Sequence, residues 1–528
     1  MRHLKVGIVD LVATERCSSV YARMMFPHFA SIMPQAVAVW CAEAGHRVTF
    51  VCYTGEGDVI DALPADLDIV FICAFTHAAL LAYAASAYYR SKGAITILGG
   101  PHARAYPAHA RRYFDYVLGL TDRALIVDLL GHCAPERPFG RYLTCAAQPR
   151  ELPSLRDRWP YLAELHRRAI APTVALIGSL GCPYTCSFCV DAPIPYQPLD
   201  YDTIRNDLRF LLTRFRRPRV GWHDPNFGVR FDEYMDVIEE AVPSGSIEFG
   251  AETSLSLLSE PRLRRLKRNG FRVMISGIES WYDHGNKSRT GTKSGSVKMR
   301  ELVEHAKLVL RYIPYLQANF VLGLDTDEGN EPFELTKRFI DLVPGVFPAS
   351  AMLTAYGESA PLSRQLQQER RVLAVPFQFL TSGHVSNVRP KHYSWDQFYA
   401  AIVDLLEHSF SWRSIYRRDR ATDGLLLRSI HLARAISLEG RGRAGYVAGL
   451  LERLRVDQQL RRFLDGETGA VPGWMADQIK GRYDSMWKWM PADALSYDAT
   501  GAADPGVDAR SDSNRVMVPT RPTGSQWR

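Results

Sequence analysis

Short apolar, β-branched runs alternate with stretches of helical period along the first 135 residues. Strands are expected at residues 4–9, 48–52, 68–74, 94–98 and 115–118, with helices between them. Strands that alternate with helices in this way are typical of a doubly wound parallel sheet. The pattern therefore predicts an open α/β domain over residues 1–135.

A second alternating series begins after residue 172. Its expected strands are residues 173–180, 219–223, 246–251, 271–278, 316–324 and 349–356, and its expected helices are 201–215, 231–240, 256–269, 298–312 and 332–342. Such alternation requires parallel pairing with right-handed crossovers. Six units fit a partial (βα)6 barrel over residues 173–375, with its active groups at the carboxyl ends of the strands.

The other segments have less regular patterns. Residues 136–172 are rich in Pro and Arg and are expected to form a linker between the two α/β domains. Helical periods at 395–412, 421–438 and 444–464 predict a small helical C-terminal domain within residues 376–496. Residues 497–528, rich in Asp, Gly, Ala, Ser and Pro, are predicted to be a disordered tail.

Composition places the chain among globular proteins. Of its 528 residues, 46% are hydrophobic and 23% charged, which excludes a wholly disordered chain, a collagen and a small disulfide scaffold. The net charge of +7 does not by itself indicate a nucleic acid partner. Residues 411–462 alone carry 12 Arg against 5 acids. This stretch is either the solvated faces of helices or a collar that attracts an anionic substrate or partner.

One segment is long enough to cross a membrane. Residues 69–89 contain no Asp, Glu, Lys or Arg over 21 positions. Thr76 and His77 divide it, so a strand followed by an Ala-rich helix explains it better. We expect no transmembrane segment, no secretory signal and a cytoplasmic location, where an odd set of nine scattered cysteines stays reduced.

Three cysteines stand apart from the rest. Cys182, Cys186 and Cys189 form a C-x3-C-x2-C cluster directly after the first strand of the second series. The composition predicts only about 0.003 such clusters by chance. Three thiolates on one tight loop can ligate three irons of a 4Fe–4S cubane and leave the fourth iron open. The alternative is a zinc site completed by His223 or a distant Glu, but no second cysteine pair follows.

This loop resembles the signature of the radical SAM superfamily, including the aromatic Phe188 before the third cysteine. The resemblance implies that S-adenosylmethionine (SAM) chelates the open iron. It also implies roles at the strand ends. Asp224 accepts hydrogen bonds from the SAM ammonium, and Glu279 accepts them from the ribose hydroxyls or reaches the iron. The further SAM-contacting residues expected on this basis are Glu252, Asn319 and, against the adenine, Gly323. Each of these could instead be an ordinary polar or turn residue that caps the next helix.

The N-terminal domain resembles the cobalamin-binding domain of one large radical SAM class, the class B methyltransferases. The features that carry this resemblance are residues 44–48, 75–77 and the Gly-Gly-Pro-His run at 99–102. Thr76, Gly99, Gly100, Pro101 and His102 are the implied cobalamin contacts. The D-x-H-x-x-G motif is absent, and the turn at 119–122 departs from the acidic turn of related chains.

The resemblance implies a radical SAM enzyme that methylates an unactivated carbon through cobalamin. Its partners would be a small-molecule, lipid or peptide substrate and an external one-electron reductant such as flavodoxin or ferredoxin. Glu279 and Asp224 are the implied catalytic residues. Two alternatives remain: a cobalamin-independent radical SAM cyclase or rearrangement enzyme, and a non-catalytic cobalamin or redox sensor. Methyl transfer by a polar route, without the radical, is also open.

Overall fold

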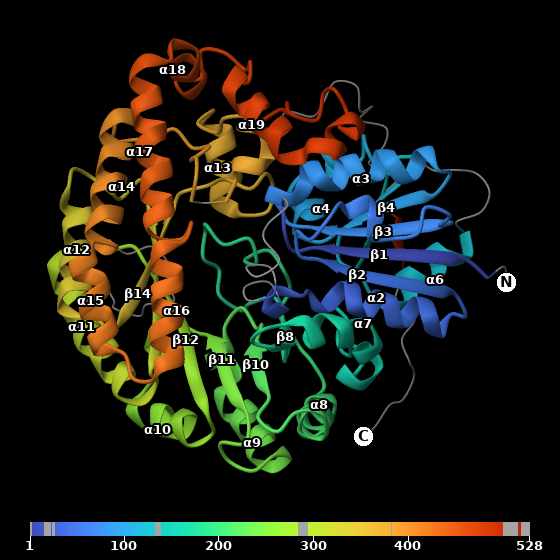
Figure 1. Cartoon of the computed structure of the whole chain (residues 1–528), viewed down its shortest axis with the longest axis horizontal. Coiled ribbons are helices and arrows are strands. Elements are labelled where there is room, and N and C mark those ends of the chain that lie inside the picture. Colours follow the sequence, from blue (N-terminus) through green and yellow to red (C-terminus); the bar gives the residue numbers. More distant parts are fainter. Residues whose placement is uncertain are drawn as a thin grey trace.

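The computed structural model describes residues 3–14, 23, 27–132, 139–282, 294–381, 383–499 and 516–518. Most of the predicted disordered tail, part of the predicted linker, and Cys17 and Cys133 lie outside these residues. Two parallel sheets and a group of C-terminal helices make up the described chain (Figure 1).

The N-terminal sheet is the predicted doubly wound sheet. Its strand order is β15-β6-β5-β4-β3-β1-β2, and all its pairings are parallel. The strands are β1 (Lys5–Leu11), β2 (Arg47–Tyr53), β3 (Ile69–Ala74), β4 (Ile95–Gly99), β5 (Tyr116–Leu118), β6 (Arg141–Cys145) and β15 (Val516–Val518). The order reverses between β1 and β3, and ligands bind at the carboxyl ends of strands beside such a point.

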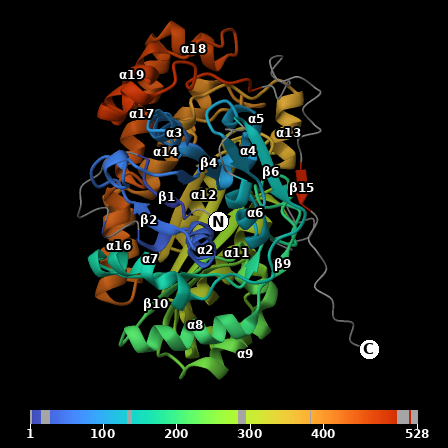
Figure 2. The same cartoon turned by 90° about the vertical axis from the view of Figure 1, so that its right-hand side faces the viewer.

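Helices cover both faces of this sheet. They are α2 (Ile32–Glu43), α3 (Ala79–Ser91), α4 (Pro101–Ala105), α5 (Pro107–Ala110), α6 (Arg123–His132) and α7 (Leu155–Arg168). Helices α2 and α6 pack on one face with α7 beside them, and α3 packs on the other (Figures 1 and 2). Residues 69–89 are β3, a 3₁₀ turn at Thr76–Ala78 and α3, as expected for an α/β unit.

Two strands of this sheet come from segments that were not predicted to be strands. The linker contributes β6, which extends the sheet beyond β5. The tail, predicted to be disordered, contributes β15, which pairs in parallel with β6 from Val516 to Val518. β15 has three residues, which is too short for a periodic pattern of apolar and polar positions. Its Val-Met-Val run also lies in a polar segment whose composition predicts disorder.

The second sheet is the predicted six-stranded partial barrel, in the order β14-β13-β12-β11-β10-β7. Its strands are β7 (Val174–Leu176), β10 (Arg219–Trp222), β11 (Glu248–Glu252), β12 (Phe271–Glu279), β13 (Tyr315–Leu322) and β14 (Val346–Met352). The predicted first strand is divided, because its end forms β8 (Ser179–Leu180), which pairs with β9 (Gln197–Pro198) in an antiparallel ladder. The sixth strand begins at Val346 and ends at Met352, earlier than predicted.

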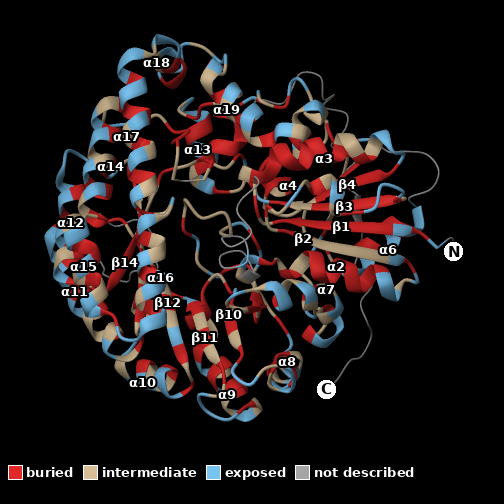
Figure 3. Ribbon diagram, viewed as in Figure 1, coloured by how far each residue is buried: buried red, intermediate tan, exposed pale blue. Residues whose placement is uncertain are grey.

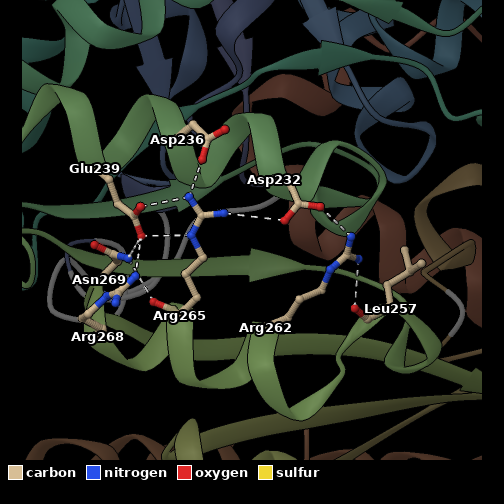
Figure 4. Close-up of polar contacts among 8 residues, drawn as sticks. All are labelled: Asp232, Asp236, Glu239, Leu257, Arg262, Arg265, Arg268 and Asn269. Atoms are coloured by element: carbon tan, nitrogen blue, oxygen red, sulfur yellow. Dashed lines mark hydrogen bonds and ion pairs between the residues drawn. The ribbon is translucent and has the colours of Figure 1, made fainter.

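The barrel helices are α8 (Tyr201–Arg214), α9 (Phe231–Ala241), α10 (Glu260–Arg268), α11 (Gly295–Tyr312), α12 (Glu331–Leu342) and α13 (Pro361–Gln368). Alternate residues of β10, β11 and β12 are buried beneath them; on β12 these include Met274, Ser276 and Ile278. Ion pairs hold α9 and α10 together on the outside (Figure 4). There the Arg265 guanidinium contacts Asp236 and Glu239. Hydrogen bonds donated by Arg265, Asn269 and Arg268 lower the pKa of Glu239 to about 2.

The C-terminal helices are α14 (Trp395–Ser409), α15 (Trp412–Ala421), α16 (Leu425–Ile436), α17 (Arg441–Val456), α18 (Gln458–Leu464) and α19 (Gly473–Tyr483). Their buried residues share one hydrophobic core with α3 of the N-terminal domain and with β13 and β14 of the barrel (Figure 3). This shared core joins the two sheets. None of the helices in the described ranges has the length and apolar character that crossing a membrane requires.

Candidate functional site

The cysteine loop leaves the barrel at the carboxyl end of β7. Cys182 and Cys186 are buried and Cys189 is half-buried, and none of the three forms a disulfide. The Cys189 amide donates to the Cys186 carbonyl at 3.0 Å, which closes a tight turn between them. Phe188 is half-buried within this turn. The predicted ligands therefore share one compact loop.

The loop is fixed at both ends. Gly181 has a φ of 69°, and a Cβ there would lie 2.6 Å from the Pro195 carbonyl oxygen, so only glycine fits. At the other end the Leu362 amide, in the first turn of α13, donates to the Ser187 carbonyl at 2.8 Å. The turn after β14 thus holds the cysteine loop in place.

Asp224 lies beneath this loop rather than in an open site. It is 1% exposed and accepts hydrogen bonds from the Gly178 amide at 2.7 Å, the Ser179 hydroxyl at 2.5 Å and the Tyr234 hydroxyl at 2.6 Å. Burial raises the pKa of this carboxyl, and the three donors favour its charged form. The carboxylate therefore positions the chain that leads to Cys182, and its predicted contact with the SAM ammonium stays a prediction.

Glu279 is the last residue of β12, as predicted, and its backbone is unusual. Its φ is 65°, in the left-handed region that a non-glycine residue adopts only at a cost, and the β12–β13 register shifts beside it. A Cβ on Gly277 would overlap the Glu279 carboxyl group, so this side chain folds over Gly277. Gly277 lies between helix-facing residues of β12, so it faces the inside of the barrel. Because the Glu279 side chain folds over Gly277, its carboxylate lies on the same inner face.

Two further predicted SAM contacts lie on inner positions. Asn319 is half-buried on β13, where its side-chain oxygen accepts a hydrogen bond from the Gln317 amide group at 2.8 Å. Glu252 is exposed at the end of β11. Asn319 and Glu252 lie next to helix-facing residues of their strands, so both face the inside of the barrel. With Glu279 they place three hydrogen-bond acceptors on the neighbouring strands β11, β12 and β13.

Gly323 has a different explanation from the predicted adenine contact. Its φ is 86°, and a Cβ there would lie 2.9 Å from the Phe398 ring of α14. Asp327 accepts hydrogen bonds from the Gly323 and Leu324 amides. The left-handed turn and the packing of α14 account for this glycine, and a flat ligand is not needed to explain it.

The donor set of the loop fits a cubane. Within the described residues, no three His, Cys, Asp or Glu side chains converge on one metal ion. A 4Fe–4S cluster does not need such convergence, because each thiolate binds a different iron. Cys182, Cys186 and Cys189 would therefore each hold one iron, and the fourth would be left for SAM.

A cavity of about 920 Å³ lies where the two sheets meet. The N-terminal domain lines it with the residues that follow β3, with α4 and α5, and with β6. The barrel lines it with residues 190–195, which follow Cys189, and with the turn after β14. The lining includes Thr76, Pro101, Asp191 and Glu358. Its volume is at the upper end of the range of ligand sites in proteins. The carboxyl ends of β3 and β4 thus face the segment that directly follows the cysteine loop.

The N-terminal residues predicted to contact cobalamin divide into two groups. Thr76 and Pro101 line the cavity, and a Cβ on Gly99 would meet nothing within 4 Å. Gly100, with a φ of 92°, would instead place a Cβ 2.9 Å from Cys73 Sγ. The close contact with β3 and the positive φ are enough to require this glycine, and its predicted contact with a corrin ring stays a prediction.

His102 lies in the core of the N-terminal domain and does not line the cavity. It is fully buried, and its Nε2 lies 2.6 Å from the Tyr83 hydroxyl, which also contacts His109. Burial lowers its pKa well below the usual value, so the ring is neutral. The histidine that reaches the cavity is His77, whose pKa burial lowers to about 4.

Sequence reasoning missed several cavity residues. Arg104 lines the cavity one turn after Pro101; burial lowers its pKa, and the nearby Asp191 carboxylate opposes that shift. Tyr142 and Thr144 come from β6, which was predicted to be a linker. The only available signal for Arg104 was its place in the helix after the Gly-Gly-Pro-His run.

The turn after β14 joins both domains at this cavity. The Glu358 amide donates to the Ala105 carbonyl of α4 at 3.0 Å, and a Cβ on Gly357, with a φ of 51°, would overlap that same carbonyl oxygen. Through the Leu362 bond to Ser187, the turn also contacts the cysteine loop. One short segment therefore sets the position of the N-terminal domain relative to the cysteines.

This combination of a three-cysteine loop on a partial barrel and a doubly wound domain beside it is the arrangement expected from the resemblance to the cobalamin-domain class of radical SAM proteins. No family model matches the sequence. Two curated relatives do, both from Chlorobaculum tepidum. Bacteriochlorophyllide d C-12(1)-methyltransferase is 21% identical over 347 residues, which are 64% of this chain and 70% of that protein. Bacteriochlorophyllide d C-8(2)-methyltransferase is 25% identical over 237 residues, 41% of this chain and 50% of that protein.

Solved structures share the fold over most of this chain. The radical SAM methyltransferase TsrM from Kitasatospora setae, with tryptophan substrate and a SAM analogue bound, aligns with a TM-score of 0.54 at 12% identity, covering 85% of this chain and 99% of that one. The same enzyme with cobalamin and a [4Fe-4S] cluster bound gives a TM-score of 0.51 at 12% identity, covering 70% and 75%. Between them, these two TsrM structures hold a [4Fe-4S] cluster, cobalamin and a SAM analogue.

Proposed function

We propose that this protein transfers a methyl group from SAM, by way of cobalamin, to an unactivated carbon of a small molecule bound in the cavity between its two sheets. The observation that carries the proposal is this cavity, because it places the carboxyl ends of the N-terminal strands against residues 190–195 beside the cysteine loop. Both cofactors can then reach one substrate. The names of the two curated relatives support a small molecule, and bacteriochlorophyllide d is the first candidate.

Residues at different positions around the cavity would bind different groups. Cys182, Cys186 and Cys189 would hold the cluster, and the inner-face acceptors Glu279 and Asn319 would orient SAM beside it. Thr76 and Arg104, with the Tyr142 and Thr144 hydroxyls, would contact cobalamin or substrate from the N-terminal side.

When bound, the cluster and SAM supply radical chemistry and cobalamin supplies the methyl group. In the radical route, the hydrogen removed from the substrate leaves in 5′-deoxyadenosine, and an external one-electron reductant of the flavodoxin or ferredoxin type supplies the electrons. In the polar route no 5′-deoxyadenosine forms. The chain's own contribution is to exclude water and fix the distance between the cofactors.

The test is a methyl-transfer assay with SAM carrying a deuterated methyl group. Anaerobically reconstituted protein, cobalamin, reductant and bacteriochlorophyllide d are incubated, and products are analysed by mass spectrometry. Transfer of the label together with 5′-deoxyadenosine supports the proposal. Formation of 5′-deoxyadenosine by protein that retains no corrinoid would favour the cobalamin-independent enzyme, and neither product with any substrate would favour the sensor.

A cavity-filling variant makes this assay specific. Ala108 is an exposed residue of α5 that lines the cavity, so Ala108→Trp fills the site without disturbing a core. The matched control is Ala42→Trp, which adds the same bulk to an exposed position of α2. We expect loss of methyl transfer and corrinoid retention in the first variant only, with iron content unchanged in both.

A further inference from the structure

Helix α16 carries an apolar face that no part of the described chain covers. Its inner side buries Leu427, His431 and Ala435, and the His431 ring stacks on Tyr315 of β13 at 4.4 Å. The apolar residues on its outer side, with their exposed fractions, are Leu425 81%, Leu426 52%, Ile430 37%, Leu432 45% and Ile436 52%, followed by Leu438 63%. Figure 3 shows exposed residues along this helix. A contiguous exposed apolar face of this kind marks an interaction surface.

Two amphipathic aromatic residues stand beside this face. Trp412 and Tyr416 lie one turn apart on α15, which contacts α16, and they are 63% and 64% exposed. The Arg441 guanidinium, at the start of α17, lies 4.9 Å from the centre of the Trp412 ring. Tryptophan and tyrosine favour the level of lipid headgroups, where the ring is half in water and half in apolar surroundings.

The charges around the face are unbalanced. Three arginines are neutralised by acids: Arg417 by Asp341, Arg428 by Asp419 and Arg434 by Glu439. Arg413, Arg420 and Arg441 form no ion pair within the described part of the chain, and Asp423 is the acid left beside them. The excess of arginine in residues 411–462 therefore leaves a net positive rim around an apolar centre.

We propose that α16, with Trp412 and Tyr416 of α15 and Arg441 of α17, docks this protein onto an anionic membrane surface. In this arrangement α16 lies in the plane of the interface, its outer side chains enter the boundary between headgroups and acyl chains, and the unpaired arginines contact lipid phosphates. No segment has to cross the bilayer. The surface does not depend on the proposed methyl transfer.

The charge pattern favours a membrane over a second copy of this chain. In a two-fold symmetric dimer the same patch meets itself, so the unpaired arginines would face one another across the interface. Anionic headgroups neutralise them instead. A dimer is therefore the competing outcome of the experiment.

The experiment is sedimentation of the full chain with vesicles of phosphatidylcholine and phosphatidylglycerol, against vesicles of phosphatidylcholine alone. The patch variant is Leu426→Ser/Ile430→Ser/Ile436→Ser. Its matched control, Ile170→Ser/Val456→Ser, removes apolar side chains that are 55% and 84% exposed elsewhere. Because all these side chains are exposed, each variant keeps its fold. We expect the patch variant to partition at least about tenfold more weakly and the control to match wild type.

A second variant tests the charge. Arg413→Gln/Arg420→Gln should weaken binding to the anionic vesicles by roughly fivefold for each arginine removed, with no change on neutral vesicles. The proposal is overturned if wild type does not bind the anionic vesicles, or if the patch and control variants bind equally. It is also overturned if wild type forms a concentration-dependent dimer that the patch variant loses while vesicle binding is absent.

Discussion

Gly357 offers the sharpest test of how the two sheets are joined. The change Gly357→Ala adds a Cβ to a residue with a φ of 51°, directly against the Ala105 carbonyl oxygen of α4. Gly329→Ala is a matched control, because Gly329 has a φ of 57° and a Cβ there would meet nothing within 4 Å. Both variants carry the same backbone cost, and only the first disturbs the junction.

The magnitudes separate the two variants. An alanine in the left-handed region costs about 1 kcal/mol, which is the whole effect expected for Gly329→Ala. Gly357→Ala also forces the turn away from α4, which costs about 1–3 kcal/mol, and loses the Glu358 amide bond to Ala105, worth about 1 kcal/mol. We therefore expect Gly357→Ala to lower the free energy of unfolding by about 3 kcal/mol or more.

The assay is urea denaturation followed by circular dichroism, together with corrinoid retention on gel filtration. Gly357→Ala should lose stability and corrinoid, whereas Gly329→Ala should lose about 1 kcal/mol of stability and keep the corrinoid. Equal losses of stability in the two variants would refute the reasoning, because the contact with Ala105 would then contribute nothing.

Three further predictions follow from individual contacts. Asp224→Asn replaces a carboxylate that accepts three buried hydrogen bonds with an amide that can accept on one side only. It should lower the free energy of unfolding, measured by thermal denaturation, by about 2 kcal/mol. Unchanged stability together with lost SAM binding would instead support a direct contact between Asp224 and SAM. The pKa of Glu239 is held near 2 by Arg265, below its ordinary 4.5, so this pair stabilises the protein above pH 4.5 and is lost as pH falls toward 2. In denaturation curves at several pH values, Glu239→Gln should remove this dependence, about 1 kcal/mol. Gly100→Ala should lower the melting temperature, whereas Gly99→Ala should leave it unchanged; equal melting temperatures would contradict the packing assigned to Gly100.

Most of the fold could be predicted because its strands are apolar runs bounded by turns. β1, β2, β3 and β4 lie within about two residues of their predicted ranges, and the order of alternation was enough to define both sheets. The three-residue edge strand β15 could not be predicted. β15 became part of the N-terminal sheet because it pairs with β6, and such pairing across the chain has no local signal.

The site was predictable where spacing alone defines the chemistry, as in the loop from Cys182 to Cys189. It was less predictable where one residue type serves two purposes. Gly323 was assigned to a ligand, but its neighbour is Phe398, on a helix much later in the chain. Asp224 was assigned to SAM, but three donors from its own barrel surround it. A single sequence does not show which side chain fills the space beside a glycine or a carboxylate.

The measurement that tests the central claim most directly is corrinoid retention. The protein is produced with cobalamin supplied, reconstituted anaerobically with iron and sulfide, and passed through a gel-filtration column while iron and corrinoid absorbance are recorded together. We predict that corrinoid co-elutes with the iron-containing protein, that Ala108→Trp loses the corrinoid and keeps the iron, and that Cys182→Ala/Cys186→Ala/Cys189→Ala loses the iron. Wild-type protein that elutes with its iron but without corrinoid would contradict the account.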